Sequence, residues 1–174
     1  MTIRSLLVGT SAFVSFIVAG SGLSAADYEF SVRFDWRSEG KIHQVWFHRE
    51  FDGLLVQTAP LEVDAGPELQ GLLAGVAIEC LAHTAIGLPN WSVTTGTCTL
   101  SQPNGTVTLE VEDCRGTQKL CEGTWQIIAA TGDFSELTGG GTNSGHLVEP
   151  NPLPWLWSGP TSGFNILSGV ITIP

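Results

Sequence analysis

Apolar and polar residues alternate along much of the chain, a pattern that predicts β-strands with one buried face. In residues 28–37, four large apolar side chains fall on one face, and charged or hydroxyl side chains fall on the other. Residues 106–112 repeat this pattern after the turn signal QPNG. No long segment after residue 26 keeps a 3.6-residue period, so we expect an all-β fold. Its core should contain the apolar residues of these two faces, which are Phe30, Val32, Phe34, Trp36, Val107, Leu109 and Val111.

Shorter apolar runs between clusters of Gly, Pro and Asn indicate further strands. The candidates are residues 42–51, 54–58, 71–82, 92–100, 123–129, 140–148 and 164–173. Helical character is confined to two short segments, at residues 67–72 and 133–137. So many short strands in one chain favour a β-barrel or a β-sandwich with short helical turns only.

The most regular stretch, CEGTWQIIAATGDFSELTGGGTNSG, covers residues 121–145. Trp125 and Ile127 alternate with polar residues, which predicts a strand that ends at the bend Thr131-Gly132. Glycine suits such a corner because it adopts positive φ and allows close backbone approach. A phosphate-binding loop is disfavoured, because no Lys-Ser or Lys-Thr follows the glycines and no helix is expected after them.

The N-terminus has the features of a cleavable secretion signal. Arg4 precedes an apolar run at residues 6–19, and Ser24-Ala25-Ala26 supplies the small side chains that signal peptidase recognises. The apolar run is shorter than the roughly 20 residues of a membrane span. We therefore expect a signal peptide at residues 1–26, a single β-barrel domain at residues 27–174, and a soluble protein in the periplasm or outside the cell.

Acidic residues outnumber basic ones by 17 to 7, which gives a formal net charge of −10. Proteins bind phosphate backbones through clustered Lys and Arg, so this composition argues against nucleic acid as a partner. Anionic lipid is disfavoured for the same reason. We expect no membrane span after signal removal and no cofactor, because the sequence contains neither a long apolar segment nor a cofactor-binding motif.

Four cysteines, Cys80, Cys98, Cys114 and Cys121, lie in the part expected to be exported. An even number in an oxidising compartment predicts two disulfides, for which three pairings are possible. The simplest pairs Cys80 with Cys98 and Cys114 with Cys121, because each bond would then join neighbouring antiparallel strands. A four-thiolate zinc site is disfavoured by the lack of a C-x2-C pair, and we predict no metal.

Residues 149–163, EPNPLPWLWSGPTSG, combine four prolines with Trp155 and Trp157. The prolines predict a stiff, extended connection between strands. Its two indole rings either fold over one end of the core or form an exposed surface for a ligand or a protein partner. The sequence leaves both interpretations open.

The motif around Trp125 resembles a signature of exported bacterial proteins whose roles are mostly uncharacterised. That signature is similar to G-T-W-x-I-x-G-G-T-G-x-F-x-G-x-T-G-x-G-T, and the apparent fold of these proteins is related to the allene oxide cyclase and dirigent barrels. The residues that match are Gly123, Thr124, Trp125, Ile127, Thr131, Gly132, Phe134, Leu137, Thr138, Gly139, Gly141 and Thr142. Ala129-Ala130, in place of a glycine pair, and Glu136, in place of a small residue, depart from it.

This resemblance, which covers about residues 71–174, implies an eight-stranded antiparallel barrel with an internal cavity. Cyclases and dirigent proteins of this kind hold apolar substrates inside the barrel. None of their catalytic residues can be matched to positions of this sequence. The resemblance therefore implies a cavity but no reaction.

Aromatic side chains and one histidine are the candidates for ligand contact. If residues 42–51 form one strand, His43 and His48 point to opposite faces and cannot bind one metal together. His48 would then share a face with Trp46, and it would be a polar group of the cavity only if that face is internal. The ligand-binding candidates are Trp36, Trp46, His48, Trp125, Trp155 and Trp157.

No catalytic residue is predicted. Glu110 and Glu112 lie opposite the apolar face of their strand, which predicts solvated carboxylates and not the facing pair of a glycosidase. The sequence also lacks the G-x-S-x-G elbow of a serine hydrolase.

We expect a non-enzymatic barrel that binds a small apolar or aromatic molecule in its lumen or at its tryptophan-rich mouth. The alternatives are an isomerase or cyclase that uses the cavity, and a structural or protein-interaction module that uses residues 149–163. An open apolar lumen would favour binding. A lumen filled by side chains would favour the interaction module; the expected fillers are Phe30, Phe34, Trp36, Trp125 and Ile171.

Overall fold

The computed structural model describes residues 25–45, 48–87, 90–117, 119–149 and 161–174. The helical elements are α1 (Pro67–Leu73) and the 3-10 turn η1 (Gly132–Phe134). The strands are β1 (Ala26–Val45), β2 (His48–Gln57), β3 (Glu62–Ala65), β4 (Ala77–Gly87), β5 (Trp91–Gln102), β6 (Gly105–Gly116), β7 (Leu120–Ala130), β8 (Thr138–Glu149) and β9 (Thr161–Ile173). Most of the predicted signal peptide lies outside the described residues, as do the candidates Trp46, Trp155 and Trp157.

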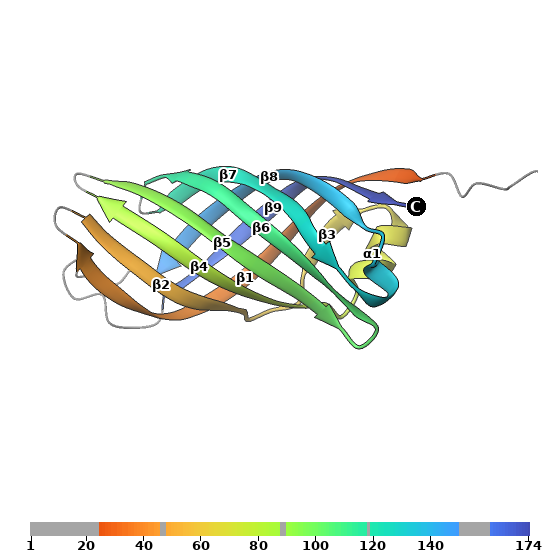
Figure 1. The fold of residues 1–174 in the computed structure, drawn as a ribbon, viewed down its shortest axis with the longest axis horizontal. Coiled ribbons are helices and arrows are strands. Elements are labelled where there is room, and N and C mark those ends of the chain that lie inside the picture. Colours follow the sequence, from red (N-terminus) through yellow and green to blue (C-terminus); the bar gives the residue numbers. More distant parts are fainter. Residues whose placement is uncertain (1–24, 46–47, 88–89, 118, 150–160) are drawn as a thin grey trace, which may run out of the picture.

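The strands form one antiparallel sheet that closes into a barrel (Figure 1). The ring runs β1, β2, β4, β5, β6, β7, β8, β9 and back to β1. The short strand β3 pairs with the N-terminal half of β1, whereas β2 pairs with its C-terminal half. The predicted eight-stranded antiparallel barrel is confirmed, and β3 is an additional strand that the sequence did not indicate.

The predicted strand at residues 42–51 is wrong, because these residues belong to two strands. β1 ends at Val45 and β2 begins at His48, and these two residues pair in antiparallel register. Residues 42–51 contain no Gly, Pro or Asn, so their alternation predicts one continuous strand. The expectation that His43 and His48 point to opposite faces fails with it, since both lie on the outer face of the barrel.

The predicted inward and outward faces are otherwise confirmed. Val107, Leu109 and Val111 of β6 are buried, while Glu110 lies on the outer face. There Gln126 of β7 donates a hydrogen bond to the Glu110 carboxylate over 3.5 Å. The period of two therefore places the apolar side chains in the lumen and the charges in solvent.

One end of the barrel is filled by closely packed side chains. The rings of Phe30 and Trp125 meet edge to face with their centroids 5.5 Å apart. Leu69 of α1 and Phe134 of η1 are buried against this cluster, so the two helical elements cover the same end of the barrel (Figure 1). Only about 40 Å³ of internal space remains here, which is too little for an organic ligand.

Both short helical elements lie where the sequence predicts them. Pro67 begins α1, a position where its missing N–H group is not needed. Gly132 has φ of 62°, and a Cβ atom at this residue would lie 1.9 Å from the carbonyl oxygen of Asn104. Glycine is therefore required at the bend between β7 and β8.

Two disulfides join neighbouring strands. Cys80 of β4 is bonded to Cys98 of β5, and Cys114 of β6 is bonded to Cys121 of β7. This is the pairing expected from adjacent antiparallel strands, and it indicates an oxidising compartment. In the described part of the chain, no helix has the length and the apolar character needed to cross a membrane.

Replacing both Cys80 and Cys98 by alanine should lower the free energy of unfolding. The bond closes a loop with a sequence separation of 18 residues, for which chain entropy predicts a loss of about 3 kcal/mol. Urea denaturation of the double variant against the oxidised parent measures the difference. An unchanged unfolding midpoint would contradict the structural role of this bond.

Replacing Gly71 by alanine should raise the free energy of unfolding. A Cβ atom at this residue of α1 would meet no other atom within 4 Å. Alanine also loses less backbone entropy than glycine in a helix, which is worth roughly 0.5–1 kcal/mol. Thermal denaturation should show a higher midpoint, and a lower one would indicate that residue 71 does not keep its helical conformation.

Candidate ligand-binding site

The half of the barrel away from α1 contains a cavity of about 140 Å³. For comparison, a dry protein cavity of about 150 Å³ lined by apolar side chains binds benzene. The space therefore matches a molecule with a single ring. Its apolar lining includes Phe34, Trp36, Phe51, Leu55, Ile86 and Leu147.

The cavity persists although all five expected filling side chains are buried in the barrel. Trp125 and Ile171 lie at the filled end, whereas Phe34 and Trp36 border the cavity. The lumen is thus half filled and half hollow. Its free volume limits any ligand to a small one. The lumen is therefore neither fully open nor fully filled.

Glycines make room for aromatic rings along the cavity wall. A Cβ atom at Gly53 would lie 2.2 Å from the ring of Phe51, and one at Gly40 would lie 2.5 Å from the same ring. A Cβ atom at Gly163 of β9 would lie 2.6 Å from the indole of Trp36, which is directly opposite on β1. The rings therefore lie against the barrel wall, where a side chain at the glycine positions would displace them.

Both disulfides line the same cavity. Cys80 and Cys98 hold β4 to β5, and Cys114 and Cys121 hold β6 to β7. Four consecutive strands of the wall are thus joined in covalent pairs. This part of the cavity should keep its shape whether or not a ligand is present.

The opposite wall carries a line of hydrogen-bonded amides. Trp36 donates its indole N–H to Oδ1 of Asn165 over 2.7 Å. Nδ2 of Asn165 then donates to Oδ1 of Asn143, also over 2.7 Å, and Nδ2 of Asn143 donates to the sulfur of Cys114 over 3.2 Å. We call this chain of four residues the amide line.

Hydroxyl groups form further polar contacts of the lining. Ser38 of β1 is hydrogen-bonded to Thr161 of β9. Thr84 and Thr94 bond each other across β4 and β5 over 2.9 Å. Ser92 donates to the carbonyl oxygen of Thr117 over 2.7 Å. Each of these hydroxyls has a protein partner, so the lining has two kinds of polar group, hydroxyls and amides.

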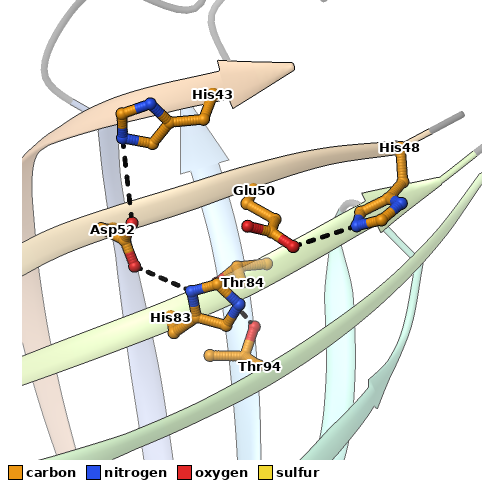
Figure 2. Close-up of polar contacts among 7 residues, drawn as sticks. All are labelled: His43, His48, Glu50, Asp52, His83, Thr84 and Thr94. Carbon is orange, nitrogen blue, oxygen red and sulfur yellow. Dashed lines mark hydrogen bonds and ion pairs between the residues drawn. The ribbon is translucent and has the colours of Figure 1, made fainter. Parts of the chain in front are cut away.

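A second polar cluster lies on the outer face of the barrel, as Figure 2 shows. Nδ1 of His83 lies 2.8 Å from one oxygen of Asp52, and Nε2 of His43 lies 3.9 Å from the other. All three side chains are between 46% and 60% exposed, so these contacts contribute little to stability. Within the described residues, no group of three or more His, Cys, Asp or Glu side chains is suited to hold a metal ion.

Of the predicted ligand-contact residues that the structure describes, Trp36 lines the cavity. Trp125 lies in the filled end, where its indole donates to the carbonyl oxygen of Ser168 over 3.2 Å. His48 lies on the outer face of β2, bonded to Glu50 over 3.1 Å and near the ring of Trp91. The structure therefore brings Trp36 to the site but keeps Trp125 and His48 away from it.

Asn143 and Asn165 were not predicted from the sequence. Asparagine is depleted in strands. An asparagine within each of two predicted strands, residues 140–148 and 164–173, was therefore the available signal of a functional position. Their inward direction was not evident, because the glycines around Asn143 hide the alternation. Asn143 is only 2% exposed, which shows that it belongs to the interior.

Comparisons with known proteins do not assign this site. No protein-family model matches the chain, and no curated protein sequence matches it.

Proposed function

We propose that the barrel binds a small, mainly apolar molecule, about the size of one ring, in its lumen. The observation that carries this proposal is the cavity of about 140 Å³ with aromatic and aliphatic walls. Sites for small molecules typically combine such walls with a few well-placed polar groups. The amide line supplies these groups.

The charges around the cavity support a neutral ligand. Within the described lining there is no carboxylate that could pair with a cation, and a buried cation without a partner is costly. Lys119 borders the cavity but is exposed, and the formal net charge of −10 disfavours the approach of anions.

The chemistry of the amide line supports binding over proton-transfer catalysis. The side chains of Asn143 and Asn165 hydrogen-bond through amides, which neither take up nor release protons near neutral pH. They can orient a ligand, but they cannot serve as a general acid or base. His146 also borders the cavity, but its ring is hydrogen-bonded to Ser144 over 3.0 Å and stacks on Phe164 with the ring centroids 4.4 Å apart. Enzymatic isomerisation or cyclisation is therefore the weaker alternative.

The disulfides support action in an oxidising compartment. Together with the signal features of residues 1–26, they support export to the periplasm or the extracellular space. Membership of the exported bacterial group with allene oxide cyclase-like barrels stays a prediction from the motif around Trp125.

Toluene should bind to the purified protein and perturb resonances of cavity residues. Burying its seven carbons at about 0.8 kcal/mol each gives a dissociation constant of roughly 0.1 mM. Titration followed by ¹H–¹⁵N correlation spectra measures this constant and locates the site. Shifts should centre on the indole N–H of Trp36, and absence of saturable shifts would contradict the proposal.

A matched pair of variants tests whether the lumen is the site. Ala82 faces the cavity, so Ala82→Phe places a ring in the binding space and should abolish toluene binding. Ala85, three residues further along β4, lies on the outer face, and Ala85→Phe should leave binding unchanged. Equal loss of binding in both variants would point to a general effect of the substitutions on folding.

A further inference from the structure

We infer that the ligand carries an oxygen atom that accepts a hydrogen bond from the side-chain amide of Asn165. The site should therefore favour a ring ketone, or a similar ring with one acceptor oxygen, over a hydrocarbon of the same shape. This inference rests on the proposed function, since it specifies which small molecule the lumen takes.

Trp36 determines the orientation of both amides. An indole N–H can only donate, so the atom of Asn165 that it meets must be the oxygen Oδ1. Nδ2 of Asn165 then faces Asn143, and the atom that it meets there must be Oδ1. Chemistry alone thus assigns the oxygen and the nitrogen of each amide.

Asn165 keeps a donor for a further partner. Each asparagine amide has two N–H groups, and Asn165 uses one of them for Asn143. No other described residue accepts a hydrogen bond from its Nδ2. Asn143 is almost completely buried, whereas Asn165 is partly exposed and borders the cavity. The free N–H of Asn165 is therefore the one that a ligand can reach.

The hydrogen-bond chain strengthens this donor. Trp36 donates to the carbonyl of Asn165, which draws electron density away from the amide nitrogen of the same side chain. Hydrogen bonds that run in one direction polarise one another in this way inside a protein. An unpaired N–H is also tolerated less well in an interior than a carbonyl with a spare lone pair. Both effects favour an acceptor on the ligand.

Gly145 lies directly beside this amide. A Cβ atom at Gly145 would lie 3.3 Å from Nδ2 of Asn165 and 3.0 Å from the sulfur of Cys121. All three residues border the cavity. The absence of a side chain at residue 145 therefore gives a ligand oxygen access to the Asn165 nitrogen.

Cyclohexanone and methylenecyclohexane form a matched pair of probes for this inference. The two molecules have nearly the same shape and differ in whether the exocyclic atom is a carbonyl oxygen or a carbon. Cyclohexanone accepts hydrogen bonds and cannot donate them. In ¹H–¹⁵N spectra of the unmodified protein, cyclohexanone should shift the side-chain amide signals of Asn165 strongly, and methylenecyclohexane should leave them nearly unchanged.

Two variants should change the ratio of the two dissociation constants. Gly145→Ala fills the space beside Nδ2, and Asn165→Ala removes the donor. Each should weaken the binding of cyclohexanone relative to methylenecyclohexane by roughly fivefold, the value of one net hydrogen bond. Gly71→Ala, which adds the same methyl group in α1 far from the cavity, should leave the ratio unchanged.

The outcomes separate this inference from the proposed function. If neither probe binds the unmodified protein, the proposed function fails and the inference fails with it. If both bind, and the ratio is the same in the unmodified protein and both cavity variants, the inference alone is wrong. Should Asn165→Ala fail to fold, Gly145→Ala decides the matter, because it removes no side chain of the amide line and adds one methyl group beside Nδ2 of Asn165.

Discussion

The length of β1 is the constraint on which the rest of the structure depends. β1 (Ala26–Val45) pairs with β9 along one edge, and with β3 and then β2 along the other. A strand of half this length would leave one end of the ring unpaired, and open edges invite association with other chains. Closure of the ring also brings the inward-facing side chains of eight strands into one interior.

That interior is divided by side-chain size. At one end Phe30, Trp125 and the leucines of α1 fill the lumen. At the other end glycines and asparagines replace large side chains, and the rings of Trp36 and Phe51 lie against glycines in the wall. The filled end stabilises the fold, which allows the other end to keep a hollow that a well-packed core would not tolerate.

The two walls of the hollow end are held in different ways. Disulfides join β4 to β5 and β6 to β7, whereas the amide line connects β1, β9 and β8 to Cys114 on β6. Cys114 belongs to both arrangements, so the polar wall is anchored to the covalent one. A ligand that bonds to Asn165 would therefore meet a donor whose position is already set by its neighbours.

The alternation of apolar residues was sufficient to predict the all-β class, the faces of β1 and β6, and the bend at Gly132, because these depend on local period and backbone geometry. The adjacency of predicted strands also favoured the disulfide pairing that the structure shows. The alternation was not sufficient to show that one strand ends at Val45 and the next begins at His48, because residues 42–51 contain no Gly, Pro or Asn. Nor could the alternation show that Trp36 meets Asn165 and Asn143, because only the pairing of β1 with β9, which closes the ring, brings Trp36 beside the other two.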